Sequence, residues 1–108
     1  MKASELIEQG NDAIAAGQIH QALALFLQAT QANPQDPDAW QSLAMTHYKL
    51  QQHHQAADAI QKAINLNPND PVLWTSLSMI QMKLGNIQAA EAASAKSRVL
   101  SWGGKIPT

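Results

Sequence analysis

The chain has 108 residues and a formal net charge of −1, and 45% of its residues are hydrophobic but only 5% are aromatic. This length suits one small domain, and a sequence pI near 6.4 argues against nucleic acid as a partner, because proteins that bind nucleic acid usually present a basic face. No cysteine is present, which excludes a disulfide framework and thiolate chemistry and is compatible with a reducing compartment.

The N-terminal residues, MKASELIEQGND, lack the apolar core of a signal peptide. No stretch further along the chain approaches the roughly 18 apolar residues that a helix needs to span a bilayer. We therefore expect a soluble, cytoplasmic protein without a membrane partner.

Much of the chain repeats with a period of 34 residues. Asn33-Pro34 recurs as Asn67-Pro68 at this spacing, and a period in this range is typical of a solenoid of stacked units. We predict one domain of three units and a short tail, at about residues 3–36, 37–70, 71–102 and 103–108. The shift superposes equivalent residues of the units: Leu6, Trp40 and Trp74; Gly10, Ala44 and Ser78; Ala22, Ala56 and Ala90; Phe26 and Ile60; and Ala29 and Ala63.

The pattern within each unit predicts two helices joined by a turn. In the second unit, Asp36 and Pro37 suit the start of a helix over about 37–50, because aspartate accepts the free N–H groups there and proline lacks one. A second helix is expected over about 54–66. It ends before Pro68, which pushes the preceding residue out of helical geometry.

Start and turn signals recur in the other units. Asp70-Pro71 repeats the helix start in the third unit. Gly17 and Gly85 fall at equivalent turns of the first and third units, where a positive φ is easily reached only by glycine. The second unit has Gln51 at this place.

Small residues are expected where the two helices of a unit cross. Little side chain at such a point lets the helix axes approach to the short end of the usual range of about 8–10 Å. On this basis first-helix residues face second-helix residues in three pairs: Gly10 and Ala22, Ala44 and Ala56, and Ser78 and Ala90.

The last helix, predicted over about 88–100, departs from the pattern of the other units. A terminal helix has no following unit to cover it, so its outer face should be polar. We expect Ser94, Ser97 and Arg98 to supply that polar face.

The third tryptophan, Trp102, follows this helix at the end of the third unit. Gly103-Gly104 ends the helix, and we expect Trp102 to fold back over its open edge, because an exposed tryptophan is costly. The alternative is that Trp102 and Ile106 dock on a partner or on another copy of the chain.

These residues resemble the pattern of the tetratricopeptide repeat family, which is Trp or Leu, then Leu and a small residue, an aromatic, and then Ala, Phe, Ala and Pro. The resemblance implies an all-α, right-handed superhelical solenoid of three antiparallel helix pairs. The second unit matches best, with Trp40, Leu43, Ala44, Tyr48 (one residue late for the aromatic), Ala56, Ile60, Ala63 and Pro68. The first has Leu6, Gly10, Gly17, Ala22, Phe26, Ala29 and Pro34, and the third has Trp74, Leu77, Leu84, Gly85 and Ala90.

The resemblance also implies a concave groove lined by the first helix of each unit. Met45, Met79 and Met82 would make it apolar, and methionine adapts its shape to different apolar partners, which suits a peptide groove. The alternative is that these methionines fill ordinary packing gaps between units. By register the groove residues are Ile7, Asn11, Ile14, Asp38, Gln41, Met45, Tyr48, Lys49, Val72, Thr75, Met79, Met82 and Lys83.

Family members that bind the Glu-Glu-Val-Asp tails of heat-shock chaperones use a two-carboxylate clamp of Lys, Asn, Asn, Lys and Arg. A carboxylate needs charge-assisted donors in order to leave water. Only the first asparagine of the clamp is retained here and all three cations are absent, so we expect no chaperone-tail binding. The matching positions are Ile7, Asn11, Ser42, Val72 and Ser76.

The four histidines do not form a recognisable metal or catalytic motif. His53 and His54 are adjacent in a turn and His20 lies a whole repeat earlier, whereas a metal site needs three or four convergent ligands. His47 falls at a packing position, where we expect it to be buried and hydrogen-bonded. No nucleophile–base pair, phosphate-binding loop or paired-carboxylate site occurs, so we expect no enzyme, metal or cofactor.

The leading hypothesis is therefore a non-catalytic adaptor that binds a short apolar or amphipathic peptide segment of another protein. The alternative is a self-associating scaffold joined through its C-terminal end, and a small enzyme ranks a distant third. Residues 1–38 carry a charge of −4 and residues 80–108 carry +3. This asymmetry could steer an acidic partner to the C-terminal end or one copy's head to another's tail, although chance clustering explains it equally well.

Overall fold

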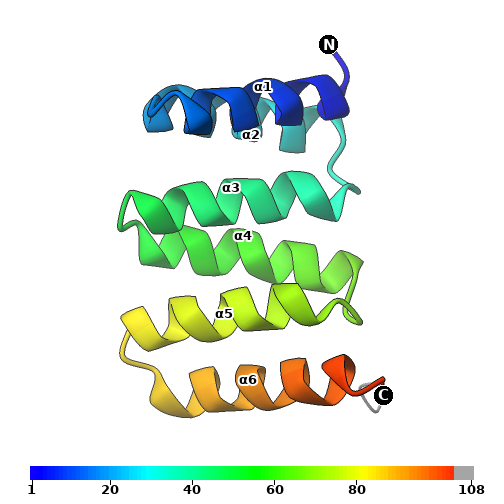
Figure 1. Cartoon of the computed structure of the whole chain (residues 1–108), viewed down its shortest axis with the longest axis vertical. Coiled ribbons are helices and arrows are strands. Elements are labelled where there is room, and N and C mark those ends of the chain that lie inside the picture. Colours follow the sequence, from blue (N-terminus) through cyan, green and yellow to red (C-terminus); the bar gives the residue numbers. More distant parts are fainter. Residues whose placement is uncertain (104–108) are drawn as a thin grey trace.

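The computed structural model describes residues 1–103, and within them the chain forms six helices that stack along the long axis of the molecule (Figure 1). The expected all-α solenoid of helix pairs is confirmed, with each pair built from helices consecutive in the chain. The helices are α1 (Ala3–Ala15), α2 (Ile19–Ala32), α3 (Pro37–Lys49), α4 (His53–Leu66), α5 (Pro71–Lys83) and α6 (Ile87–Ser101). No helix in this part of the chain is both long and apolar enough to cross a membrane.

The predicted helix starts are confirmed in α3 and α5. The Asp36 carboxylate accepts a hydrogen bond from the Asp38 N–H at 2.9 Å, and the Asp70 carboxylate accepts one from the Val72 N–H at 3.0 Å. Each aspartate precedes a proline in the first turn. The aspartate side chain pairs one N–H group that has no partner within the helix, and the proline has no N–H group to leave unpaired.

The three turns within the helix pairs share one backbone conformation. Gly17 and Gly85 have φ of 78° and 79°, and Gln51, at the equivalent place between α3 and α4, has φ of 61°. A left-handed residue ends each first helix and lets the chain reverse. Gln51 adopts this conformation without the freedom of glycine, which costs free energy.

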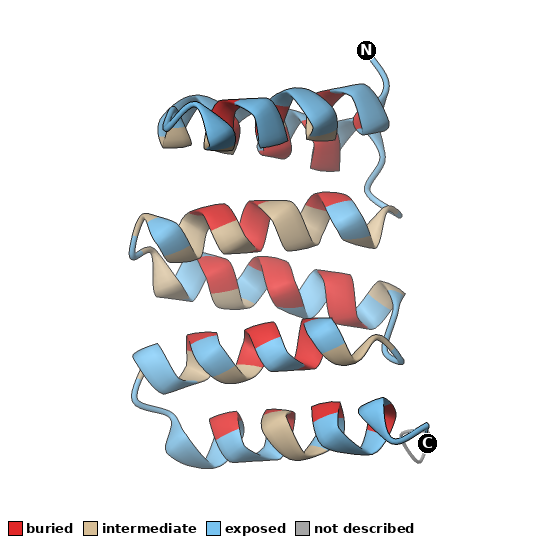
Figure 2. Ribbon diagram, viewed as in Figure 1, coloured by how far each residue is buried: buried red, intermediate tan, exposed pale blue. Residues whose placement is uncertain are grey.

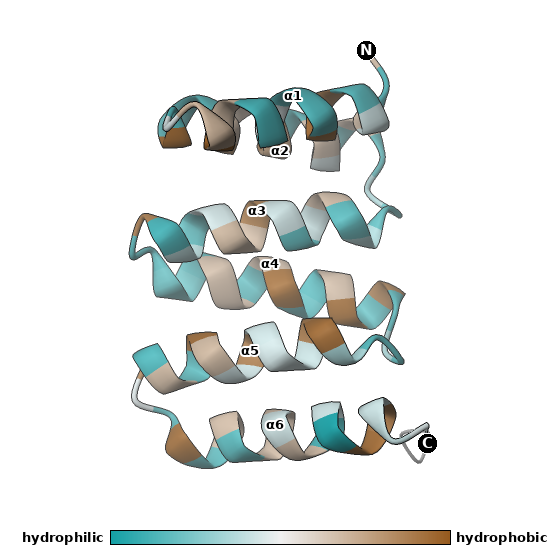
Figure 3. Ribbon diagram, viewed as in Figure 1, coloured by the Kyte–Doolittle hydropathy of each residue, from teal (hydrophilic) through white to brown (hydrophobic). Residues whose placement is uncertain are grey.

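Buried residues lie on the helix faces that point toward neighbouring helices (Figure 2), and the same faces carry much of the apolar sequence (Figure 3). Ala22, Ala56 and Ala90 are all fully buried at the helix crossings. The expected contact of the third pair is present, because Ser78 Oγ donates to the Ala90 carbonyl at 2.8 Å. In the first pair, Phe26 fills the space in front of Gly10.

Two tryptophans join consecutive helix pairs in the same way. Trp40 Nε1 donates to the Pro34 carbonyl at 2.9 Å, and Trp74 Nε1 donates to the Pro68 carbonyl at 2.7 Å. The carbonyl belongs to the segment that follows the preceding pair, so each indole ties a first helix to the unit before it. A lysine from the second helix of the same pair, Lys62 or Lys96, lies 4.5 Å from the centroid of the corresponding ring.

The expectation for Ser97 is wrong, because this side chain is buried. Its hydroxyl lies 2.6 Å from Thr75 Oγ1 and donates to the Pro71 carbonyl at 3.0 Å. Ser97 is equivalent by register to Ala29 and Ala63, which are fully buried within their own pairs. The neighbouring helix α5 therefore covers it whatever follows α6. Arg98 is exposed as expected and donates to the half-buried Ser94 hydroxyl.

The expectation that Trp102 covers the end of α6 is also wrong, since its side chain is 80% exposed. Leu100 is the residue that packs inward, and two further residues rotate the chain about 200° around the helix axis, which turns Trp102 to solvent beside Val99. Gly103 has φ of 82° and ends the helix as predicted. Gly104 and Ile106 lie outside the described residues.

Candidate functional site

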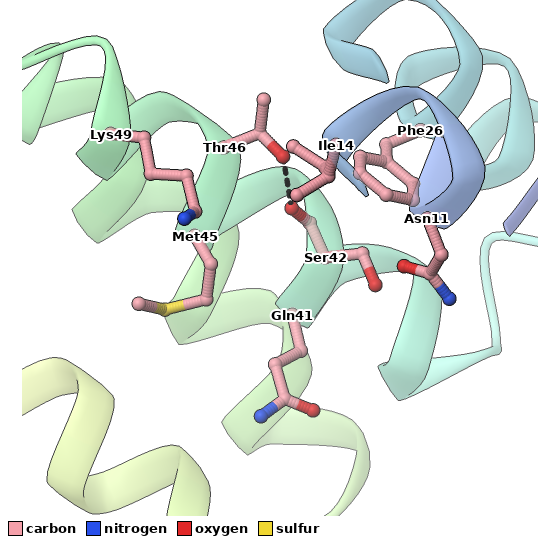
Figure 4. Close-up of a pocket in the computed structure, with 8 residues that line it drawn as sticks. All are labelled: Asn11, Ile14, Phe26, Gln41, Ser42, Met45, Thr46 and Lys49. Atoms are coloured by element: carbon pink, nitrogen blue, oxygen red, sulfur yellow. Dashed lines mark hydrogen bonds between the residues drawn. The ribbon is translucent and has the colours of Figure 1, made fainter. Parts of the chain in front are cut away.

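A pocket lies between α1 and α3, with α2 contributing one side chain (Figure 4). Its volume is about 220 Å³. The walls combine apolar groups with amides, hydroxyls and one ammonium group. The lining residues are Asn11 and Ile14 from α1, Phe26 from α2, and Gln41, Ser42, Met45, Thr46 and Lys49 from α3.

Helical spacing places the pocket residues on common faces. Gln41, Met45 and Lys49 are four residues apart and form one line along α3, and Asn11 and Ile14 are three apart on α1. These five are predicted groove residues, and helical register places them on the faces of α1 and α3 that line this pocket. Phe26, Ser42 and Thr46 were not predicted to belong to the site.

Two of the three additional residues, Phe26 and Thr46, have identifiable reasons for lining the pocket. Phe26 stands opposite Gly10, where the missing side chain leaves room for its ring to reach between α1 and α3. Thr46 Oγ1 donates to the Ser42 carbonyl at 2.8 Å, which keeps its hydroxyl on the helix and its methyl group free to pack (Figure 4). The glycine at position 10, inside a helix, is the sequence feature that could have predicted Phe26 as a pocket residue.

The predicted residues of α5 lie outside this pocket. Val72, Met79 and Met82 are 55%, 41% and 51% exposed, so they form an apolar surface rather than part of the core. Met82 also lines a separate cavity with Ser78, Ala90, Glu91, Ser94 and Arg98. Thr75 Oγ1 is held by Ser97 and by the Pro71 carbonyl, and Lys83 is exposed at the last residue of α5.

Three further predicted residues have other surroundings. Tyr48 is half-buried and its ring packs edge-on against His53, with centroids 5.4 Å apart and planes at 61°. Ile7 is half-buried against the core, and Asp38 is exposed in the first turn of α3.

Of the four histidines, His47 and His53 lie beside the turn between α3 and α4. His47 is half-buried and its Nδ1 lies 2.7 Å from Gln52 Oε1, so it is hydrogen-bonded across that turn. His53 Nδ1 is buried without a hydrogen-bond partner in residues 1–103. In the same part of the chain, no three side chains of His, Cys, Asp or Glu converge as metal ligands would.

The sequence pattern of the tetratricopeptide repeat matches residues 13–80. Together with the three helix pairs, this match shows that the chain belongs to the tetratricopeptide repeat family. Membership of that family indicates a protein–protein interaction module. A comparison with curated protein sequences gives no match.

Several solved structures share the fold. The second tetratricopeptide domain of Spaghetti (RPAP3), bound to the HSP90 peptide SRMEEVD, matches with a TM-score of 0.89 at 18% identity over 93% of each chain. MamA matches with a TM-score of 0.90 at 18% identity, over 94% of this chain and 60% of its own. The Sgt2 domain from Aspergillus fumigatus gives 0.87 at 24% identity, over 95% and 69%. At these identities the similarity establishes the fold alone.

Proposed function

We propose that the chain is a non-catalytic adaptor that binds a short apolar or amphipathic segment of another protein across α1, α3 and α5. The observation that carries this proposal is the pocket between α1 and α3, which the chain's register predicts in large part. The exposed Val72, Met79 and Met82 continue an apolar surface on α5. We place this adaptor in the cytoplasm, because a chain without cysteine is compatible with a reducing compartment.

The size of the pocket favours a peptide over a small metabolite. Its volume of about 220 Å³ is below the range of about 300–1,000 Å³ that is usual for small-molecule sites. A pocket of this size suits one side chain of a longer ligand. The mixed walls, with Ile14, Phe26 and Met45 beside polar Asn11 and Gln41, provide apolar contact and hydrogen bonds to such a segment.

Recognition of the chaperone tail seen in the Spaghetti complex is not part of this proposal. Two of the positions that carry cations in the clamp are Ile7 and Val72, which have no donor to offer a carboxylate. The third, Ser76, is only 6% exposed and packs inside the solenoid. We therefore expect a peptide ending in Glu-Glu-Val-Asp to bind no more tightly than a peptide with the same residues in scrambled order.

A second candidate function is self-association through the C-terminal end, and the exposure of Trp102 favours it. A tryptophan that is 80% exposed at the end of a helix, next to the 41% exposed Val99, offers an apolar contact to another molecule. The two functions use different ends of the molecule and do not exclude each other.

The adaptor proposal is tested by selecting binders from an unbiased library of displayed random peptides. Selected peptides should bind the chain and lose at least about tenfold in affinity when Met45 is replaced by glutamate, because the change replaces an apolar contact in the pocket wall with a carboxylate that must be desolvated. Ala24→Glu, an equal change at an exposed position of α2, is the control. A selection that yields no binder, or binders indifferent to Met45→Glu, contradicts the proposal.

A further inference from the structure

A further pocket lies where the second helix pair follows the first. Its volume is about 210 Å³, and its walls come from the segment between α2 and α3, from α3 and from α4. This volume is below the range of about 300–1,000 Å³ that is usual for small-molecule sites, so the pocket suits one large side chain. The lining residues are Pro34, Trp40, Lys62, Asn65 and Leu66.

The walls of this pocket match an indole ring. Trp40 and Leu66 are half-buried and provide apolar contact. Lys62 Nζ lies 4.5 Å from the centroid of the Trp40 ring, and the same ammonium group can contact a second aromatic ring. Asn65 Oδ1 accepts a hydrogen bond from Gln61 Nε2 at 3.0 Å and, as an amide oxygen, can accept another from an indole N–H.

The equivalent place in the third unit is closed. Trp74 and Leu100, which correspond to Trp40 and Leu66, are each only 9% exposed. The packing role of this tryptophan in the repeat therefore does not require an open pocket beside it. The second unit departs from the third in leaving one.

The chain itself presents an exposed indole, that of Trp102, which is 80% exposed beside Val99. This side chain does not reach the pocket of its own chain, because the Trp102 N–H is bonded to the Arg98 and Val99 carbonyls at the end of α6 and α5 lies between α4 and α6 (Figure 1). A second copy can supply it. The C-terminal ends of α2, α4 and α6 lie on one side of the molecule, so the pocket and Trp102 share an edge (Figure 1).

Charges near the pocket and near Trp102 are complementary. Asp36 and Asp38 lie at the start of α3, in the segment that leads into the pocket wall, against the ammonium group of Lys62. Arg98 lies one helical turn before Trp102 and is exposed. A contact that brings the indole of one copy to the pocket of another therefore brings a guanidinium group toward carboxylates.

We propose that Trp102 of one copy enters this pocket of a second copy, and that two copies related by a two-fold axis exchange their tryptophans. Each copy offers both the indole and the pocket, so the same contact forms twice. This inference rests on the self-association proposed above and adds the surface that receives the indole. An aromatic side chain buries about 150–250 Å², so the two contacts, counted on both copies, stay below the roughly 1,200 Å² of a stable interface and the dimer is weak.

The test measures the mass of the full chain by sedimentation equilibrium from micromolar to millimolar concentration. We expect the mass to rise from one chain toward two. Trp102→Ala removes the indole and Asn65→Glu places a carboxylate in the pocket wall, so each should weaken the dimer at least about tenfold. Gln55→Glu makes the same charge change at an exposed position about 15 Å away along α4 and should leave the dimer within about twofold.

A mixture of the two weakened variants tests the exchange itself. A heterodimer keeps one intact contact, because Trp102 of the Asn65→Glu copy can enter the unaltered pocket of the Trp102→Ala copy. We therefore expect the mixture to associate at least about fivefold more tightly than either variant alone, a gain that corresponds to one restored aromatic contact. Circular dichroism of each variant checks that it is folded.

The outcomes separate this inference from the function on which it rests. A dimer that is lost in Trp102→Ala but kept in Asn65→Glu overturns the pocket as the receiving surface, whereas self-association through the C-terminal end still stands. A mixture that associates no better than its folded components overturns the exchange. A chain that stays monomeric at millimolar concentration contradicts both the exchange and self-association, and leaves a side chain of another protein as the occupant of the pocket.

Discussion

Gly10 and Phe26 are fitted to each other across the crossing of α1 and α2. A methyl group at position 10 would lie 2.7 Å from Phe26 Cζ and 2.8 Å from Cδ1, closer than carbon atoms normally approach. Because Phe26 also lines the pocket, the absence of a side chain in α1 decides where one wall of the site stands. Gly10 therefore links the packing of the first helix pair to the shape of the binding surface.

This contact predicts that Gly10→Ala destabilises the protein. Alanine gains about 1 kcal/mol in helix propensity, but overpacking against a rigid ring costs about 1–3 kcal/mol, so we expect a net loss of about 1 kcal/mol. The double variant Gly10→Ala with Phe26→Ile, which copies the Ala44–Ile60 pair of the second unit, should recover much of that loss. Denaturant melts of the single and double variants measure the coupling, and simple additivity would contradict the fitted contact.

The indole bonds between helix pairs predict that Trp74→Phe lowers stability by about 1–2 kcal/mol. Phenylalanine keeps most of the apolar contact but removes the donor to the Pro68 carbonyl. The effect at Trp40 should be smaller, since that indole is more exposed. Trp102→Phe is the control and should be neutral within about 0.5 kcal/mol. Thermal or denaturant melts decide the matter, and equal effects at Trp74 and Trp102 would refute the role of the bond.

The left-handed residue in the second turn predicts a stabilising substitution. Gln51→Gly should raise the free energy of unfolding by about 0.5–1 kcal/mol, because glycine adopts φ near 61° without the steric cost that glutamine carries. The reverse change, Gly85→Ala, should lower it by about 1 kcal/mol at the equivalent turn. Urea melts under identical conditions provide the comparison, and a loss of stability in Gln51→Gly would show that its side chain is needed there.

Exposure of Trp102 predicts that Trp102→Ala changes the stability of the monomer by no more than about 0.5 kcal/mol. If the C-terminal end mediates self-association, the same variant should weaken a concentration-dependent increase in mass measured by light scattering. A loss above about 1 kcal/mol at all concentrations would mean that Trp102 is packed in solution. If neither the stability nor the association of the variant changes, Trp102 contributes to neither.

Much of the fold follows from local sequence signals. The period of 34 residues, the Asp-Pro starts and the positive-φ turns are each set by a few residues close together, and so they can be predicted without coordinates. Ser97 and Trp102 were misplaced because polarity at the end of a solenoid was inferred from residue type. How far each side chain is buried depends instead on how α6 is rotated against α5. Ser97 is buried because it occupies the position that Ala63 has in the preceding unit. Trp102 is exposed because it lies about 200° around the helix axis from the buried Leu100.

The candidate site was predictable in part for a similar reason. Gln41, Met45 and Lys49 follow one face of α3, and a face is a property of sequence spacing. Phe26 belongs to the ordinary core pattern of its helix, and only the size of its partner at position 10 brings it into the pocket. Volumes between helices depend on pairs of residues from different segments, so spacing within one helix does not predict them.

The central claim is that α1, α3 and α5 form the binding surface, and nuclear magnetic resonance tests it most directly. The amide spectrum of the isotope-labelled chain is followed while a peptide from the unbiased selection is added. We predict shifts concentrated at the amides of Asn11, Gln41, Met45 and Lys49, with weaker shifts at Met79 and Lys83 on α5. Shifts confined to the second helices or to the end of α6 near Trp102, or no shifts at millimolar peptide, would contradict the account.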